Sequence, residues 1–347
     1  QAFKSFVEMD DKVGALEAIS GIGWAELQNG QLDTADALYG QAVNRARELQ
    51  DARGEAAAIT AKARVEQQKR NFSGANILFT RVLNKFDQLE DLAGAGEAIL
   101  GQALVARRTG QFDDALELYE DAQDTFEEGD DPIGVAKANH GSAIVRLQRG
   151  EYVSAEHLLR ESIATAEEVG ATQIAMEGRF GLASLFRHQG QFDRARASYA
   201  EYQRWATRTG TFEGQIFGNL GIAMLCLELG DLEGMYDAST QAVLQLNKVQ
   251  GHWLWASYRL IVAAMLACRG QEDETWQWLW AANELGLGDT VDTDNAHCLA
   301  VICEVASSRR WGNALRLAGK LGIAQFTALG QRERAVAIRE QMSGVLG

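Results

Sequence analysis

The sequence predicts an all-α fold, a solenoid built from consecutive pairs of antiparallel helices. Three observations predict it: a short motif recurs with a regular period of about 40 residues, small side chains recur at one position of that period, and the 347 residues contain a single proline. Because proline interrupts helix interiors, its near absence favours long uninterrupted helices. Because self-similarity at a period of about 20 to 50 residues is typical of repeat architectures, the whole chain is interpreted as one array.

The recurring motif is a turn glycine, then an aromatic or leucine residue, then an alanine five positions after the glycine. Its clearest copies are Gly30–Ala35, Gly110–Ala115, Gly150–Ala155 and Gly190–Ala195, and weaker ones lie near Arg70, Gly230, Gly270 and Arg310. A period of about 40 residues accommodates two helices, a helix A before the turn and a helix B after it. We number positions within the period as columns, so that Arg107 occupies column 27.

Each predicted helix has one face of small or aromatic residues. Column 23 of helix A is Gly23 in the first repeat and alanine in the next six, from Ala63 to Ala263. A small residue at a fixed helical position lets a neighbouring helix approach closely. Helix B carries alanine at column 35 and a ring or leucine four residues later, as in Ala115 and Tyr119. That spacing places both side chains on one face.

The predicted starts of the helices carry capping residues. Asp33, Asp113 and Asp193 follow the turn glycine and are expected to cap helix B through their side-chain oxygens. Asp131 followed by Pro132 repeats this pattern at the start of a helix A, because proline is favoured at the first helical position.

These residues resemble the tetratricopeptide repeat in a 40-residue form, as in Pins-type and kinesin-light-chain adaptors and in sensor arrays linked to bacterial Ser/Thr kinases and signal-transduction ATPases. The resemblance implies a right-handed superhelical α-solenoid. We expect residues 1–10 to end a truncated repeat helix, residues 11–322 to form eight repeats and residues 323–347 to contain a capping helix over 323–342. More protein is expected upstream of Gln1. Pairing is less regular where Arg70 replaces the turn glycine.

Composition narrows the functional classes. The formal charge of −15 opposes a nucleic-acid partner, which needs a dominant basic surface. The longest apolar run, Leu260 to Cys268, is too short to span a membrane, for which about 20 residues are needed. Four cysteines without paired spacing indicate reduced thiols in a cytoplasmic protein rather than disulfides or a zinc site.

The family resemblance implies that helix A lines a concave groove, with ligand contacts at columns 17, 20, 24, 27 and 28. We predict contacts to a protein or peptide partner there from these residues: Arg64, Gln67, Arg107, Arg108, Lys137, His140, Phe180, Arg187, His188, Phe217 and Met224. The A helices, expected at 54–70, 94–110, 134–150 and 174–190, carry eleven Lys or Arg against four Asp or Glu. This bias favours an acidic or amphipathic segment.

A structural reading of the same residues stays open. Cations near the end of a helix also complement its dipole, and the apolar positions in repeats 6 and 7 also fit a buried core. A second surface is the pair Trp276 and Trp280 on one ridge of helix B, at columns that are mostly polar elsewhere. We consider it a contact for a partner or for a homodimer, with burial against the next repeat as the alternative.

No catalytic, metal or cofactor site is predicted. The five histidines are scattered over different repeats, and no phosphate-binding loop or nucleophile motif is present. The sequence therefore predicts a non-enzymatic protein-interaction module within a larger bacterial-type signalling protein. Two alternatives remain: an intramolecular regulatory sensor of a Ser/Thr kinase or signal-transduction ATPase, and a scaffold that self-assembles.

Overall fold

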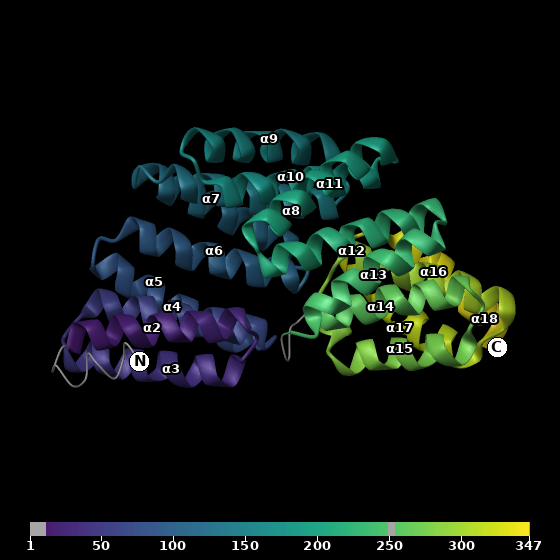
Figure 1. The fold of residues 1–347 in the computed structure, drawn as a ribbon, viewed down its shortest axis with the longest axis horizontal. Helices are drawn as coiled ribbons and strands as arrows, with labels where there is room; N and C mark the ends of the chain where they lie inside the picture. The colour runs from purple at the N-terminus through teal and green to yellow at the C-terminus, as the bar shows by residue number, and fades with distance from the viewer. Residues whose placement is uncertain (1–11, 249–253, 347) are drawn as a thin grey trace. The chain divides into compact units, whose positions relative to one another are not determined.

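The chain folds almost entirely into α-helices. The computed structural model describes residues 12–248 and 254–346, which form seventeen α-helices, one 3-10 helix and no strand (Figure 1). The all-α fold predicted from the repeat period is confirmed. The truncated repeat helix expected at residues 1–10 lies outside the described residues.

Helices A and B alternate along the described chain, and each A helix packs against the B helix that follows it. The A helices are α2 (Lys12–Gln28), α4 (Ala52–Gln68), α6 (Leu92–Arg108), α8 (Pro132–Gln148), α10 (Thr172–His188), α12 (Phe212–Leu229), α14 (Leu254–Cys268) and α16 (Thr293–Arg309). The B helices are α3 (Leu32–Glu48), α5 (Phe72–Gln88), α7 (Phe112–Glu128), α9 (Tyr152–Glu168), α11 (Phe192–Thr209), α13 (Leu232–Leu246), α15 (Glu272–Glu284) and α17 (Gly312–Ala328). A 3-10 helix, η1 (Leu287–Asp289), follows α15, and α18 (Arg332–Leu346) ends the described chain.

The helices belong to two compact units. The first comprises the described residues of Gln1–Arg107, Gln111–Ser142 and Lys248–His252. The second comprises Arg108–Gly110, Ala143–Asn247 and the described residues of Trp253–Gly347. Each unit has its own buried apolar clusters, for example around Phe79 in the first and around Leu159 in the second.

Helix ends follow the repeat because a residue with left-handed backbone stops each helix A. Gly30 has φ 70°, and the residues at the equivalent position of the next five repeats, from Arg70 to Gly230, also have positive φ. The second of these ends, at Arg70, lacks the turn glycine, yet Arg70 adopts φ 61° and α4 still pairs with α5. Helices α4, α6, α8 and α10 begin and end two residues earlier than the sequence predicted.

The capping prediction is correct at one position and wrong at three. Asp131 caps α8, because its side chain accepts hydrogen bonds from the backbone N–H groups of Ile133 and Gly134, both at 3.0 Å. Helices α3, α7 and α11 instead start one residue before Asp33, Asp113 and Asp193, after glutamines that make no side-chain cap. These aspartates lie in the first turn, where a carboxylate still complements the helix dipole.

The A helix of one repeat packs closely on the ring or leucine of the preceding B helix. A Cβ atom built on Gly101 would lie 2.3 Å from Phe79, and one on Gly141 would lie 2.1 Å from Tyr119. In the second unit, Gly221 packs in the same way on Tyr199. The alanines at column 23, from Ala63 to Ala263, are fully buried. Small residues therefore set the distance between helices, as the sequence predicted.

The end of the chain differs from the expected single capping helix over 323–342. Helix α17 runs to Ala328, Gly330 adopts φ 73°, and α18 begins at Arg332. The left-handed glycine divides the segment, and α18 packs on α17 where Met342 contacts Gly319. In the part of the chain that the structure describes, no helix is long and apolar enough to cross a bilayer.

We predict that Gly141→Ala lowers the free energy of unfolding by about 1–3 kcal/mol in a urea titration, because the new methyl group collides with the buried Tyr119 ring. Gly40→Ala is the control, since only Lys62 Nζ, at 3.8 Å, lies near the added atom in α3. The control should be neutral or stabilising by about 0.5–1 kcal/mol. Equal stability of the two variants would refute this account of the packing.

Candidate functional site

The most extensive buried polar network of the second unit surrounds Arg187. This residue lies in the last turn of α10, and its side chain is 0% exposed. A guanidinium carries five N–H donors and stays charged, so burying it requires acceptors and a balancing negative charge. Both are present around Arg187.

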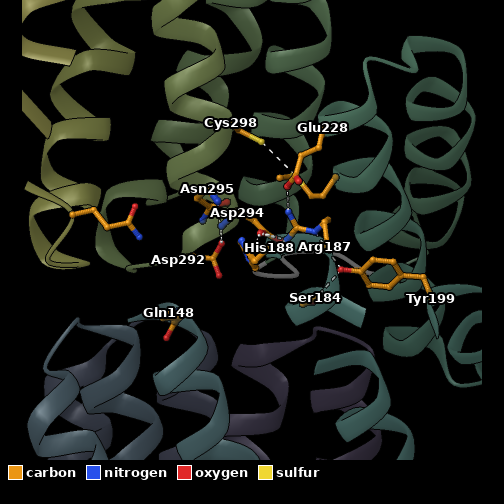
Figure 2. A network of polar contacts seen from close by, with 12 residues as sticks. Gln148, Ser184, Arg187, His188, Tyr199, Glu228, Asp292, Asp294, Asn295 and Cys298 are labelled. Carbon is orange, nitrogen blue, oxygen red and sulfur yellow. Dashed lines mark hydrogen bonds and ion pairs between the residues drawn. The ribbon is translucent and has the colours of Figure 1, made fainter. Parts of the chain in front are cut away.

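Three helices supply the acceptors (Figure 2). Arg187 Nη1 donates to Glu228 of α12, and Nη2 donates to Asp294 of α16. The Nε–H donates to the Tyr199 hydroxyl of α11 at 3.4 Å, and Ser184 Oγ lies 3.0 Å from the same hydroxyl. The network thus ties α10 to α12 and to a helix more than one hundred residues away in the sequence.

The charges in this network stabilise one another against desolvation. Burial disfavours the charged form of Arg187, but Asp294, Tyr199 and Glu228 outweigh it and raise the pKa of the guanidinium well above its ordinary value. Burial likewise opposes the charge of Asp294, but Arg187 and His188 outweigh it and lower the pKa of that carboxyl. At Glu228 burial wins, and the pKa of the carboxyl is raised. The surroundings therefore favour the charged form of Asp294 more than that of Glu228.

His188 is a neutral member of the network. Burial, and then the positive charge of Arg187, lower its pKa to about 4. Its Nε2 lies 3.3 Å from Arg187 Nη2 and must accept this hydrogen bond, because a guanidinium only donates. The imidazole also stacks on Tyr152 of α9, with ring centroids 6.5 Å apart.

Burial favours the neutral forms of the neighbouring Cys298 thiol and His297 imidazole. Burial raises the pKa of the Cys298 thiol well above its usual range, and its Sγ contacts Met224 Sδ at 3.5 Å. Burial also lowers the pKa of His297. In residues 12–248 and 254–346, no group of three His, Cys, Asp or Glu side chains is placed to hold a metal ion. The arrangement can bind a charge, but it holds no thiolate nucleophile.

In the first unit, the predicted partner contacts include a chain of ion pairs. Arg64 Nη2 and Lys137 Nζ bind the two oxygens of Glu97, at 2.5 and 2.6 Å. Gln67 is buried and donates to the carbonyl oxygen of Gly101 at 2.8 Å. His140 is half-buried and interacts with neighbouring groups.

Arg107 differs from most cations of this surface in having no ion pair with a described residue. At least eight of the eleven cations that the sequence placed in these A helices form ion pairs: Lys62, Arg64, Lys69, Lys137, Arg146, Arg149, Arg179 and Arg187. Arg70 and Arg108 interact with other neighbouring groups. For Arg107, the described residues provide no ion pair, and its buried Nε has no acceptor.

In the second unit, the apolar residues predicted to contact a partner pack against neighbouring side chains. Phe180 and Phe217 are half-buried, with ring centroids 5.9 Å apart, and Phe180 also contacts Tyr202 at 5.0 Å. Met224 is 1% exposed beneath α16. The Trp276 and Trp280 rings on α15 contact each other in a tilted arrangement, with centroids 5.6 Å apart and an interplanar angle of 42°, and Trp280 is 48% exposed.

Sequence reasoning missed the acidic partners. Glu97 and Glu228 occupy columns 17 and 28, which belong to the predicted contact stripe, so the signal was present in the sequence. Asp294 lies 107 residues from Arg187, and no local pattern relates the two. Tyr199 was identified only as the ring of helix B.

Comparisons with known proteins agree with the fold. Residues 95–168 match the family model of the tetratricopeptide repeat. No curated protein matches the sequence. A solved Rap protein, complexed with Competence and Sporulation Factor, is 15% identical with a TM-score of 0.64, over 79% of this chain and 74% of that one.

Two further solved structures are similar. The Rap conjugation gene regulator of plasmid pLS20, in complex with the Phr* peptide, is 14% identical with a TM-score of 0.61, over 98% of this chain and 94% of that one. Aspartyl phosphate phosphatase F from Bacillus subtilis is 12% identical with a TM-score of 0.60, over 86% of this chain and 76% of that one. At these identities the likeness shows a shared helical-solenoid fold alone.

We predict that protonation of His188 destabilises the second unit in acid. Its folded pKa of about 4 lies below the ordinary 6.5, so the unfolded chain binds more protons between these values and stability falls as pH drops through them. The loss should reach about 1–3 kcal/mol, judged from urea titrations between pH 7 and 4.5.

The same titrations on two variants isolate this effect. His188→Gln should flatten the pH dependence, whereas the control His157→Gln should not, because the His157 side chain is 71% exposed. An unchanged slope in His188→Gln would rule out His188 as the source. Comparing variants is necessary because Glu228, whose pKa is raised, shifts stability in the opposite direction over part of this range.

Proposed function

We propose that the chain binds a protein or peptide segment along its A-helix surface, because residues 95–168 match the tetratricopeptide repeat and the described chain folds into consecutive helix pairs. In the first unit this surface consists of columns 17, 20, 24, 27 and 28 of α4, columns 17 to 27 of α6 and the corresponding positions of α8 through His140. A structural neighbour whose structure was solved in complex with a peptide supports this general activity.

One observation indicates which chemical groups the partner should present. Arg107 is a charged side chain on this surface whose Nε is buried without an acceptor. An unsatisfied buried donor is unfavourable, and a carboxylate supplied from outside would satisfy both the donor and the charge. Two other predicted contact residues of this surface, Arg64 and Lys137, already share Glu97. We therefore propose a partner segment with an acidic residue against Arg107 and apolar residues beside it.

The register of the repeats explains why Arg107 lacks a carboxylate of its own. Arg187 occupies the same column as Arg107 two repeats later, and Glu228 likewise occupies the column of Gln148 two repeats later. The position that supplies an acid to Arg187 is therefore occupied by an uncharged amide in the earlier repeat. This difference supports binding rather than helix-end stabilisation as the role of Arg107.

The wider role that we propose is regulatory and non-enzymatic. The resemblance to signalling arrays supports a cytoplasmic interaction module of a larger bacterial-type signalling protein, and one structural neighbour is described as a gene regulator. The polar side chains around Arg187 bind one another, which favours a binding role over catalysis. In an intramolecular sensor, the acidic segment would come from the same polypeptide.

We expect Arg107→Ala to weaken binding of N-acetylhexaglutamate, used as an acidic probe, by about tenfold in fluorescence anisotropy titrations. Raising the salt concentration from about 50 to about 300 mM should weaken binding to the unchanged protein, because an ion pair with an accessible arginine is screened. Arg316→Ala is the control, since Arg316 is exposed on the B helix α17. Equal affinity of the two variants would overturn the role of Arg107.

Self-assembly through the tryptophan ridge is a second candidate. The favouring observation is that Trp280 is 48% exposed and contacts the Trp276 ring, since exposed aromatic pairs are typical anchors of interfaces. A scaffold of this kind would use α15 rather than the A-helix surface.

For this candidate we expect light scattering coupled to gel filtration to give twice the 37.9 kDa mass of one chain at micromolar concentration. Trp280→Ala should restore the mass of one chain, because truncating a central aromatic anchor removes about 2 kcal/mol or more of association energy. Trp24→Ala is the matched control, as Trp24 is 60% exposed on α2. A single-chain mass at every concentration would exclude the candidate.

A further inference from the structure

The guanidinium of Arg187 presents separate groups to two carboxylates from different helices. Its Nη1 donates to Glu228 of α12, and its Nη2 donates to Asp294 of α16, while Nε donates to Tyr199 (Figure 2). Each carboxylate therefore has its own donor group on Arg187. The two differ in side-chain length and in their place on the helix that carries them.

Asp294 is fixed by its place at the start of a helix. It lies in the first turn of α16, where a negative charge is favoured by the helix dipole. Asp292 caps this turn by accepting hydrogen bonds from the backbone N–H groups of Asp294 and Asn295, at 2.9 and 3.0 Å. Further along the helix, Cys298 is buried against Met224. These hydrogen bonds fix the backbone that carries Asp294, whose side chain is 34% exposed.

Glu228 lies at the opposite end of its helix from Asp294. It is the last residue but one of α12, and a negative charge at that end of a helix is unfavourable. The following Leu229 is 39% exposed, and Gly230 ends the helix with φ 70°. The glutamate side chain, which is 16% exposed, has one more rotatable bond than that of Asp294, and burial raises the pKa of its carboxyl despite the nearby arginine.

We propose that Glu228 is a displaceable internal substitute for a carboxylate of the partner, which takes its place on Nη1 of Arg187 while Asp294 stays bound. The proposal rests on the proposed function, because it assumes an acidic partner segment. Exchanging one carboxylate for another preserves the charge balance of the buried guanidinium. Asp294, Tyr199 and His188 keep the guanidinium oriented during the exchange.

The first experiment tests the exchange with a small carboxylate and needs no partner. Glu228→Ala removes the resident acid, so acetate should enter and raise the thermal unfolding midpoint of this variant by about 2 °C or more at about 100 mM, relative to chloride at equal ionic strength. The unchanged protein should show no acetate-specific shift. Glu233→Ala is the matched control, because Glu233 is exposed near the start of α13.

An equal acetate effect in all three proteins would overturn the proposal, because it would show that acetate does not act at Arg187. A shift confined to Glu228→Ala would support it. The result does not depend on an acidic peptide, so it separates failure at Glu228 from failure of the proposed function.

The second experiment measures competition by Glu228 in the shape-conserving variant Glu228→Gln. Because the variant lacks the competing charge, N-acetylhexaglutamate should bind it about tenfold more tightly than the unchanged protein. Glu233→Gln should stay within twofold. Unchanged or weaker binding in Glu228→Gln would refute the displacement, even where Arg107→Ala still weakens binding and upholds the proposed function. If the probe binds no variant, the acidic-partner function fails and the acetate result alone decides on Glu228.

Discussion

The structure depends on one packing contact that recurs with the repeat: a glycine of helix A lies against the ring or leucine of the preceding helix B. Phe79 with Gly101 and Tyr119 with Gly141 make it in the first unit, and Tyr199 with Gly221 makes it in the second. Because a Cβ atom on these glycines would collide with the ring, the contact sets how closely a helix A approaches the preceding helix B. Successive A helices are then close enough for a column-27 side chain to reach the next A helix, as Gln67 reaches the Gly101 carbonyl oxygen. Tyr199 takes part in both kinds of contact, since its ring packs on Gly221 and its hydroxyl accepts from Arg187.

This spacing determines what happens to the positive charge of the A helices. The excess of cations that the sequence shows is largely compensated by acids on neighbouring helices, such as Asp36 for Lys62 and Glu97 for Arg64 and Lys137. Exposed pairs of this kind contribute little to stability, but they remove the cations from competition for a ligand. A count of charges along a helix therefore overestimates the charge available to a partner. What distinguishes Arg107 is the absence of a paired carboxylate among the described residues, not its position near a helix end.

The sequence predicted the helices well because the period fixes their packing faces, but side chains that act across repeats were harder to anticipate. The buried alanine column and the pairing of α4 with α5 through Arg70 follow from local geometry. The aspartate caps were misplaced because glutamine precedes the helix at Gln31, Gln111 and Gln191, and helix starts depend on backbone angles that no single residue type encodes. The division at Gly330 was missed because an amphipathic pattern continued through it. Glu97 could have been identified from the sequence because it occupies column 17 of the predicted contact stripe. The pairing of Arg187 with Asp294 could be seen only in the tertiary fold.

The two equivalent arginines would contribute differently to recognition. At Arg107 a partner carboxylate would form a new ion pair, so its contribution should add to affinity and weaken with salt. At Arg187 a carboxylate would replace Glu228, so the number of ion pairs would stay constant and much of the salt dependence would cancel. The exchange favours the partner only when its carboxylate fits the buried Nη1 better than Glu228 does, and geometry rather than net charge decides that comparison. An accessible arginine would thus attract acidic segments in general, and a covered one would select among them by shape.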